Sequence, residues 1–144
     1  MLNGFEDAFM DAQAKIVSLS LELLSNAKME ADKIYIYIYQ SDIQIFFNSF
    51  FEKDRRLYRL NDWFGDEQIN DYFDCGEEDI ENIIDICDTY DGECPHEFKL
   101  VYNIKTRAFD SNYNYDDVTS DGDKDLVDIY HAWFKECESK IVGC

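Results

Sequence analysis

The chain has 144 residues, and its 32 acidic side chains against 13 Lys and Arg give a formal net charge of −19 at pH 7. A hydrophobic fraction of 46%, with ten Tyr and eleven Phe, is far above that of a disordered acidic tail, so we expect one folded domain over residues 1–144. The negative charge argues against nucleic acid or an anionic membrane as a direct ligand and favours a cationic partner.

The first two predicted elements differ in hydrophobic period. Between residues 5 and 27, apolar side chains recur at steps of three and four, which predicts an amphipathic helix. Asn3 is in position to cap its start. The period changes to two over residues 34–39, where Ile and Tyr alternate, and this predicts a strand with both faces largely covered.

Two more strands and a second helix are expected to follow. After a turn at residues 40–42, residues 43–51 are predicted to return as a strand, and a further turn leads into a third strand at 57–60. Residues 61–76 are interpreted as a loop with a short helix. From Glu78 to Tyr90 the period is helical again. The apolar face of this helix is formed by Ile80, Ile83, Ile84 and Cys87.

The next segment predicts a second hairpin. Gly92 and Pro95 are expected to end the middle helix. Apolar residues alternate along 98–104, and a turn near 103–107 leads into a partner strand that runs through residues 109–115.

The last part of the chain is predicted to form a polar loop, at residues 116–123, that caps a closing helix from Leu126 to Cys137. Strands therefore occur in hairpins and do not alternate with helices. This order predicts an α+β fold with an antiparallel sheet built from hairpins and covered by N-terminal, middle and C-terminal helices.

Two polar clusters resemble metal-binding motifs without matching them. Cys94 and His96 lie close together, but their spacing to Cys87 or Cys75 matches no zinc template, and a turn after a helix is the better interpretation. The segment Asp117–Asp128 departs from the calcium-loop template at its eighth and twelfth positions, so a capped loop is preferred to a calcium site.

The sequence offers no catalytic or cofactor signature. It contains no GxSxG elbow and no glycine-rich phosphate loop, and its carboxylates are too abundant for any one pair to indicate catalysis. We therefore expect a protein that is not an enzyme and binds no cofactor or metal. A small enzyme that uses a carboxylate pair is the alternative.

The N-terminus and the cysteines indicate a cellular compartment. No secretory leader and no apolar run long enough to span a bilayer is present, so we expect a cytoplasmic protein. An odd number of cysteines without a CxxC pair predicts reduced thiols. The five are Cys75, Cys87, Cys94, Cys137 and Cys144.

One stretch of the chain carries a single sign of charge. Between Arg59 and Lys99 there are fourteen acidic side chains and no Lys or Arg. They are Asp62, Asp66, Glu67, Asp71, Asp74, Glu77, Glu78, Asp79, Glu81, Asp85, Asp88, Asp91, Glu93 and Glu97. Because unpaired like charges destabilise a compact fold, this stretch indicates a surface for a cationic partner, with a solvated acidic face as the alternative.

Two hairpin segments carry a family resemblance. Residues 33–47 read KIYIYIYQSDIQIFF, and residues 97–117 contain FKLVYNIKTRAFDSNYNYDD, an apolar strand followed by a Lys-Thr turn and a Tyr-rich strand. Together with the closing helix, which contains Trp133, Phe134 and Glu136, they resemble the YezG-like immunity (antitoxin) family over about two thirds of the chain. The segment 26–32 lacks the Pro and Trp expected before the first strand.

The resemblance implies a non-enzymatic role, in which the protein binds and neutralises a cognate bacterial toxin, often a nuclease. A nuclease active site is basic because it holds phosphates, so a carboxylate-rich surface is suited to bind there. We therefore expect an immunity protein whose partner is a basic toxin domain. An acidic adaptor or nucleic-acid mimic is a further alternative.

The predicted contact surface is the polar face of the middle helix together with the loop before it, because the apolar face of that helix must be buried. The predicted partner-binding residues are Asp71, Tyr72, Asp74, Glu77, Glu78, Glu81, Asp85 and Asp88.

Overall fold

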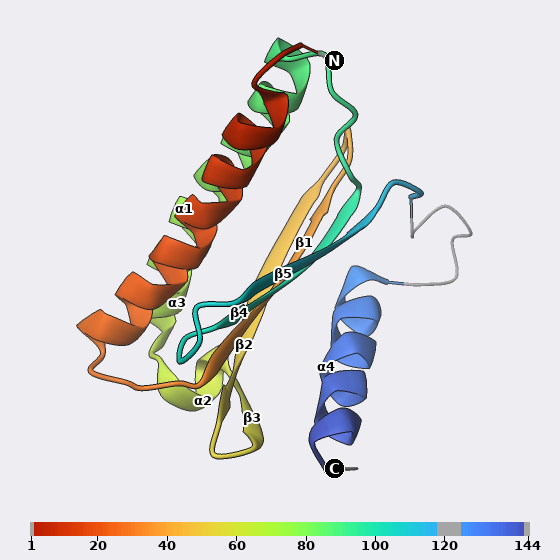
Figure 1. The fold of residues 1–144 in the computed structure, drawn as a ribbon. Coiled ribbons are helices and arrows are strands. Elements are labelled where there is room, and N and C mark those ends of the chain that lie inside the picture. The colour runs from red at the N-terminus through yellow and green to blue at the C-terminus, as the bar shows by residue number, and fades with distance from the viewer. Residues whose placement is uncertain (1, 118–124, 143–144) are drawn as a thin grey trace. The chain divides into compact units, whose positions relative to one another are not determined.

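A computed structural model describes residues 2–117 and 125–142, and Figure 1 shows its ribbon. The predicted α+β class, the antiparallel sheet built from hairpins and the N-terminal, middle and C-terminal helices are confirmed. The chain divides into two compact units, each made from two stretches of sequence. Unit 1 contains residues 1–29 and 64–94, and unit 2 contains residues 30–63 and 95–144.

Successive stretches of the chain belong to the two units in turn. Unit 1 contains helices α1 (Phe5–Asn26) and α3 (Asp66–Thr89). Unit 2 contains the short helix α2 (Leu60–Trp63), helix α4 (Leu126–Val142) and five strands. The strands are β1 (Lys33–Gln40), β2 (Ile45–Lys53), β3 (Arg56–Arg59), β4 (Glu97–Asn103) and β5 (Phe109–Asn114). They form one sheet in the order β3-β2-β1-β4-β5, and every neighbouring pair is antiparallel.

The prediction of a loop with a short helix over residues 61–76 is confirmed only for the short helix, and the loop is wrong for residues 66–76, which belong to α3. Helix α2 begins at Leu60, and α3 begins at Asp66, twelve residues before the predicted start at Glu78. The backbone N–H of Gly65 donates to Oε1 of the Gln68 side chain at 3.1 Å, which satisfies a free donor at this helix start. Gly76 lies in the middle of α3, where a glycine is unfavourable, and it obscured the helical period.

Two smaller expectations also need correction. The residue that caps α1 is Gly4 and not Asn3, because the backbone turns through a left-handed conformation there (φ 90°) without any side-chain cap. The second strand begins at Ile45 and not at Ile43, whose side chain is 87% exposed in the turn that follows β1.

The core of unit 2 lies between the sheet and α4. The tyrosines of β1 point to the face that α4 covers, and Figure 1 shows the helix along that face. Tyr35 pairs with Phe50 in the β1–β2 register, and their rings stack at 4.6 Å between centroids. Phe50 also meets Trp133 of α4 edge to face at 5.1 Å. The isoleucines of β1 are fully buried as well, so the prediction of a strand covered on both faces is confirmed.

Each tyrosine of β1 donates its hydroxyl to a carboxylate. Tyr35 donates to Glu52 at 3.0 Å, Tyr39 donates to Asp117 at 2.8 Å, and Tyr37 donates to Glu97, a carboxylate that is itself only 6% exposed. Buried polar groups are costly unless they are paired, and these hydrogen bonds allow three tyrosines to occupy an apolar layer.

A pH above about 10 is expected to destabilise this core. Burial, reinforced by the neighbouring carboxylates, raises the pKa of Tyr35 and Tyr37 above the ordinary value of 10.0. Because the folded pKa exceeds the unfolded one, the stabilisation is complete below pH 10 and is lost as the pH rises, by up to about 1.4 kcal/mol per pH unit for each hydroxyl. Urea unfolding at stepped alkaline pH measures this slope, and constant stability across that range would contradict the prediction.

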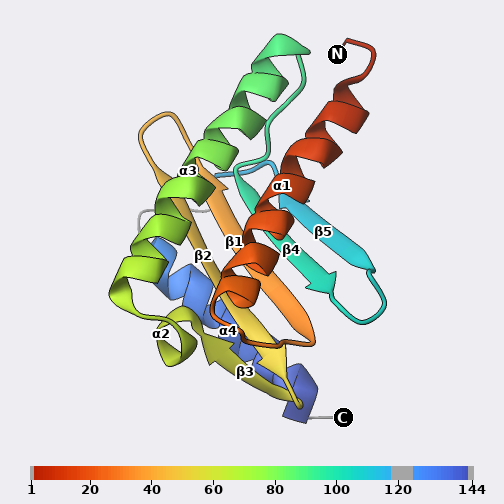
Figure 2. The same cartoon turned by 90° about the vertical axis from the view of Figure 1, so that its left-hand side faces the viewer.

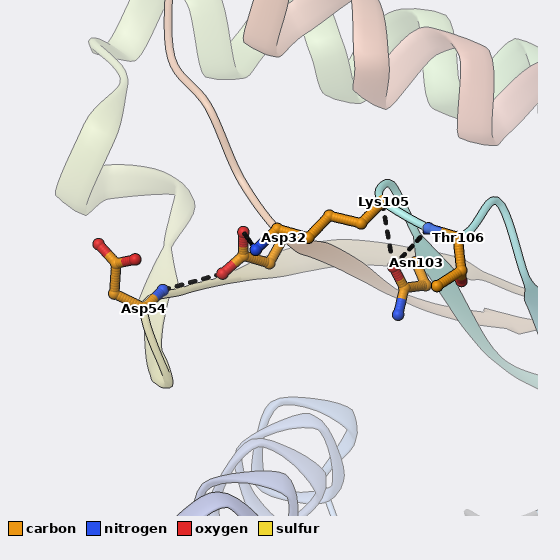
Figure 3. A network of polar contacts seen from close by, with 5 residues as sticks. All are labelled: Asp32, Asp54, Asn103, Lys105 and Thr106. Atoms are coloured by element: carbon orange, nitrogen blue, oxygen red, sulfur yellow. Dashed lines mark hydrogen bonds and ion pairs between the residues drawn. The ribbon is translucent and has the colours of Figure 1, made fainter.

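A polar network joins the two turns at one end of the sheet to the start of β1 (Figure 3). The carboxylate of Asp32 accepts the backbone N–H of Asp54 at 3.0 Å and pairs with the Lys105 ammonium at 3.1 Å. The side chain of Asn103 accepts the backbone N–H groups of Lys105 and Thr106. The bond from Asp54, followed by the contact with Lys105, lowers the pKa of Asp32.

Candidate protein-binding surface

Unit 1 is a pair of antiparallel helices. Figures 1 and 2 both show α1 and α3 side by side. The backbone N–H of Leu2, before α1, donates to the Tyr90 carbonyl, after α3, at 2.6 Å, which joins the start of one helix to the end of the other. Apolar side chains of both helices are buried on one face of each. On α3 the buried residues are Tyr72, Gly76, Ile80, Ile83 and Cys87.

Tyr72 lies in the buried layer and not on the predicted contact surface. Its side chain is 2% exposed, and its hydroxyl lies 2.7 Å from Ser20 Oγ on α1. Ser20 uses its own proton to donate to the Ile16 carbonyl, so Tyr72 is the donor to Ser20. The sequence-based expectation that Tyr72 contacts a partner directly is therefore corrected, because this hydroxyl holds α3 against α1.

The outer side of α3 carries a straight row of carboxylates. Seven exposed acids follow one another at alternating steps of four and three residues, which places them in a band roughly 100° wide along about 32 Å of helix. We call this row the acidic stripe. It consists of Glu67, Asp71, Asp74, Glu78, Glu81, Asp85 and Asp88.

The charge of the chain is concentrated in unit 1. This unit has sixteen acidic side chains against two lysines, Lys15 and Lys28, which gives a formal charge of −14 out of the total of −19. The ion pairs found within the described residues, Lys105–Asp32 and Lys140–Glu136, both lie in unit 2. The stripe therefore presents its charge without an opposite charge paired to any of its members in the described structure.

Most of the residues predicted for the contact surface belong to this stripe. All of them lie on α3, and all except Tyr72 are exposed. Glu77 is exposed beside the stripe, one turn before Glu81. Sequence reasoning missed Glu67, although its four-residue step to Asp71 continues the same spacing, because the helix was expected to start later.

A groove runs between the two helices at the N-terminal end of α3. It has a volume of about 250 Å³, and we call it the α1–α3 groove. Its lining residues are Leu19, Glu22, Leu23, Asn26, Gln68, Asp71, Tyr72 and Cys75. Asp71 belongs both to this groove and to the acidic stripe.

The pKa of the Cys75 thiol reports the electrostatic field of the acidic stripe. Burial, followed by the charges of Glu78, Asp79, Asp71 and Asp74, raises the pKa of this thiol above 9.0. Changing Glu78 to Gln and Asp71 to Asn is expected to lower that pKa, and the exposed thiol should then be alkylated faster near neutral pH. Mass spectrometry of the peptide containing Cys75 measures the rate. Asp11→Asn, on α1, is the control, and an unchanged rate in the double variant would contradict the prediction.

Three of the residues considered for metal binding, Cys87, Cys94 and His96, have hydrogen-bond partners in the structure. Nδ1 of His96 lies 2.9 Å from the Gln40 carbonyl, and since a carbonyl only accepts, this nitrogen carries the proton. The free thiol of Cys94 donates a hydrogen bond to the sulfur of Cys87, which raises the pKa of Cys94 and lowers that of Cys87. The described residues contain no group of three His, Cys, Asp or Glu side chains placed to hold a metal. Most of the predicted loop at 116–123 lies outside the described residues, and with it the centre of the calcium-like segment.

No helix in the described part of the chain combines the length and the apolar character needed to cross a bilayer.

Comparison with protein families finds no family model that matches the chain, and no curated protein sequence matches it significantly.

Proposed function

We propose that the protein is an immunity protein that binds and neutralises a cognate bacterial toxin domain, with the acidic stripe as the contact surface. The observation that carries the proposal is the stripe itself, seven exposed carboxylates of one sign on a single helix. Six successive like-charge contacts at helical spacing destabilise a helix by roughly 0.2–0.5 kcal/mol each. A partner that supplies positive charge relieves this repulsion, and the relief contributes to the free energy of binding.

The spacing of the stripe suits a surface that normally holds a polyanion. One carboxylate recurs about every 5 Å along the helix axis, and a nucleic-acid strand carries one phosphate about every 3.4 Å of rise. The basic groove that binds phosphates in a toxic nuclease is therefore a surface that α3 can occupy. When α3 lies there, the nucleic-acid substrate is excluded. The resemblance of the two hairpins to the YezG-like immunity family supports the same role.

The proposal predicts that a neighbouring gene encodes the toxin domain, and the test is co-expression of that domain with this protein. The immunity protein should restore growth of cells that express the domain and should co-purify with it at low salt. An unrelated basic nuclease of similar net charge is the control, because general charge attraction would make it bind equally well. Absence of binding to the matched domain at low salt would refute the proposal. Turnover of a substrate by the isolated protein would favour the small carboxylate-dependent enzyme.

A further inference from the structure

The α1–α3 groove has the size of a side-chain pocket. Sites for small-molecule ligands usually enclose about 300–1,000 Å³, and this groove, at about 250 Å³, lies below that range. It joins the acidic stripe through Asp71, so a partner that lies along the stripe passes over the groove as well. The occupant that fits is therefore part of the partner and not a separate molecule.

The chemistry of the lining selects a long cationic side chain. Leu19 and Leu23 of α1 supply apolar surface, which suits an aliphatic stem. Glu22 from α1 and Asp71 from α3 supply two exposed carboxylates, and no Lys or Arg lines the groove. We propose that the groove receives an arginine side chain of the basic partner, with its guanidinium between Glu22 and Asp71.

Arginine fits this arrangement better than lysine. A guanidinium is planar and presents five donors in a fixed fork, so it bonds carboxylates from two helices at once, whereas an ammonium is a compact point charge. A guanidinium is also more weakly hydrated than an ammonium, so it loses less hydration when it enters the groove.

The groove gives the stripe a register that the stripe alone does not have. Because its charges repeat every seven residues, a basic partner displaced by one repeat along α3 meets nearly the same field. An arginine that enters the groove fixes one position. The groove offers a single pair of carboxylates, Glu22 from α1 and Asp71 from the stripe. The stripe then provides attraction, and the groove provides specificity. This inference rests on the proposed function, because the arginine belongs to the toxin domain.

The first experiment removes one groove charge and compares it with a matched charge elsewhere. Glu22→Gln and Asp11→Asn each remove one exposed acid from α1, but only Glu22 lines the groove. Loss of a charged hydrogen bond is expected to weaken toxin binding by about tenfold to a hundredfold in Glu22→Gln. Asp11→Asn should stay within about twofold of the unaltered protein. Equal effects of the two changes would overturn the proposal.

The second experiment needs no toxin. Butylguanidinium, which has an aliphatic stem and a guanidinium, is titrated into the full ¹⁵N-labelled chain, with butylammonium as the comparison. Saturable shifts at Leu19, Gln68 and Asp71, larger for butylguanidinium and reduced in Glu22→Gln, are the expected result. Shifts spread evenly along α3 would overturn the groove proposal while leaving toxin binding intact. Saturable shifts without toxin binding would instead refute the proposed function alone.

Discussion

Association with the proposed toxin partner is expected to slow by roughly tenfold or more when the C-terminal half of the acidic stripe is neutralised, because electrostatic steering scales with the charge that faces the partner. The variant carries Gln or Asn at Glu78, Glu81, Asp85 and Asp88. Its affinity should also depend less steeply on salt, since fewer charges remain to be screened. Stopped-flow or surface-based kinetics at stepped ionic strength measures both quantities.

A control variant separates the stripe from net charge. It removes four exposed carboxylates of unit 2 and so has the same formal charge as the stripe variant. The control residues are Glu30, Asp42, Asp110 and Asp128. Single exposed acids should cost little, whereas an acid desolvated opposite a toxin Lys or Arg should cost roughly 2–5 kcal/mol of binding. Unchanged affinity and salt slope in the stripe variant would favour a solvated acidic face.

The same substitutions are expected to leave the fold intact and to raise its stability. They relieve at least four like-charge contacts within the stripe, and at roughly 0.2–0.5 kcal/mol each the gain is about 1–2 kcal/mol. Binding and stability should therefore change in opposite directions. This opposition distinguishes a lost binding surface from a damaged fold.

The sequence predicts those parts of the fold in which the pattern is local. Alternation of Ile and Tyr over residues 34–39 identifies β1 and both of its buried faces, because side chains of a strand point alternately to two sides. The first half of α3 was missed because Gly76 interrupts its buried face. Once the helix is known to start at Asp66, the spacing from Glu67 onward can be read as one stripe.

The groove and the role of Tyr72 depend on contacts between distant parts of the chain. Ser20 is the partner of Tyr72 from 52 residues away, and Glu22 meets the same groove as Asp71. Periodicity shows which face of each helix is buried, but not which residues of α1 lie opposite which residues of α3. The stripe was therefore largely predictable from the sequence, whereas the groove beside it was not.

Removing the hydroxyl of Tyr37 is expected to cost roughly 2–4 kcal/mol of stability, because the buried carboxylate of Glu97 then loses its hydrogen-bond donor. Glu97 is 6% exposed and Tyr37 is fully buried, so water has little access to replace the lost bond. Tyr37→Phe keeps the ring and its contacts with α4, including Trp133 at 6.1 Å between centroids. The measured loss therefore reports the hydroxyl and not a cavity. Urea unfolding at neutral pH is the measurement.

Tyr35→Phe is the matched control for this change. It removes the same hydroxyl from the same face of β1, but its acceptor, Glu52, is partly exposed, and water is able to take over the bond. We expect a loss below about 1 kcal/mol there. Adding Glu97→Gln to Tyr37→Phe should recover part of the stability, since a neutral amide is less costly to bury than a carboxylate. Equal losses in the two Tyr→Phe variants, with no recovery in the double variant, would show that burial of Glu97 does not set the cost.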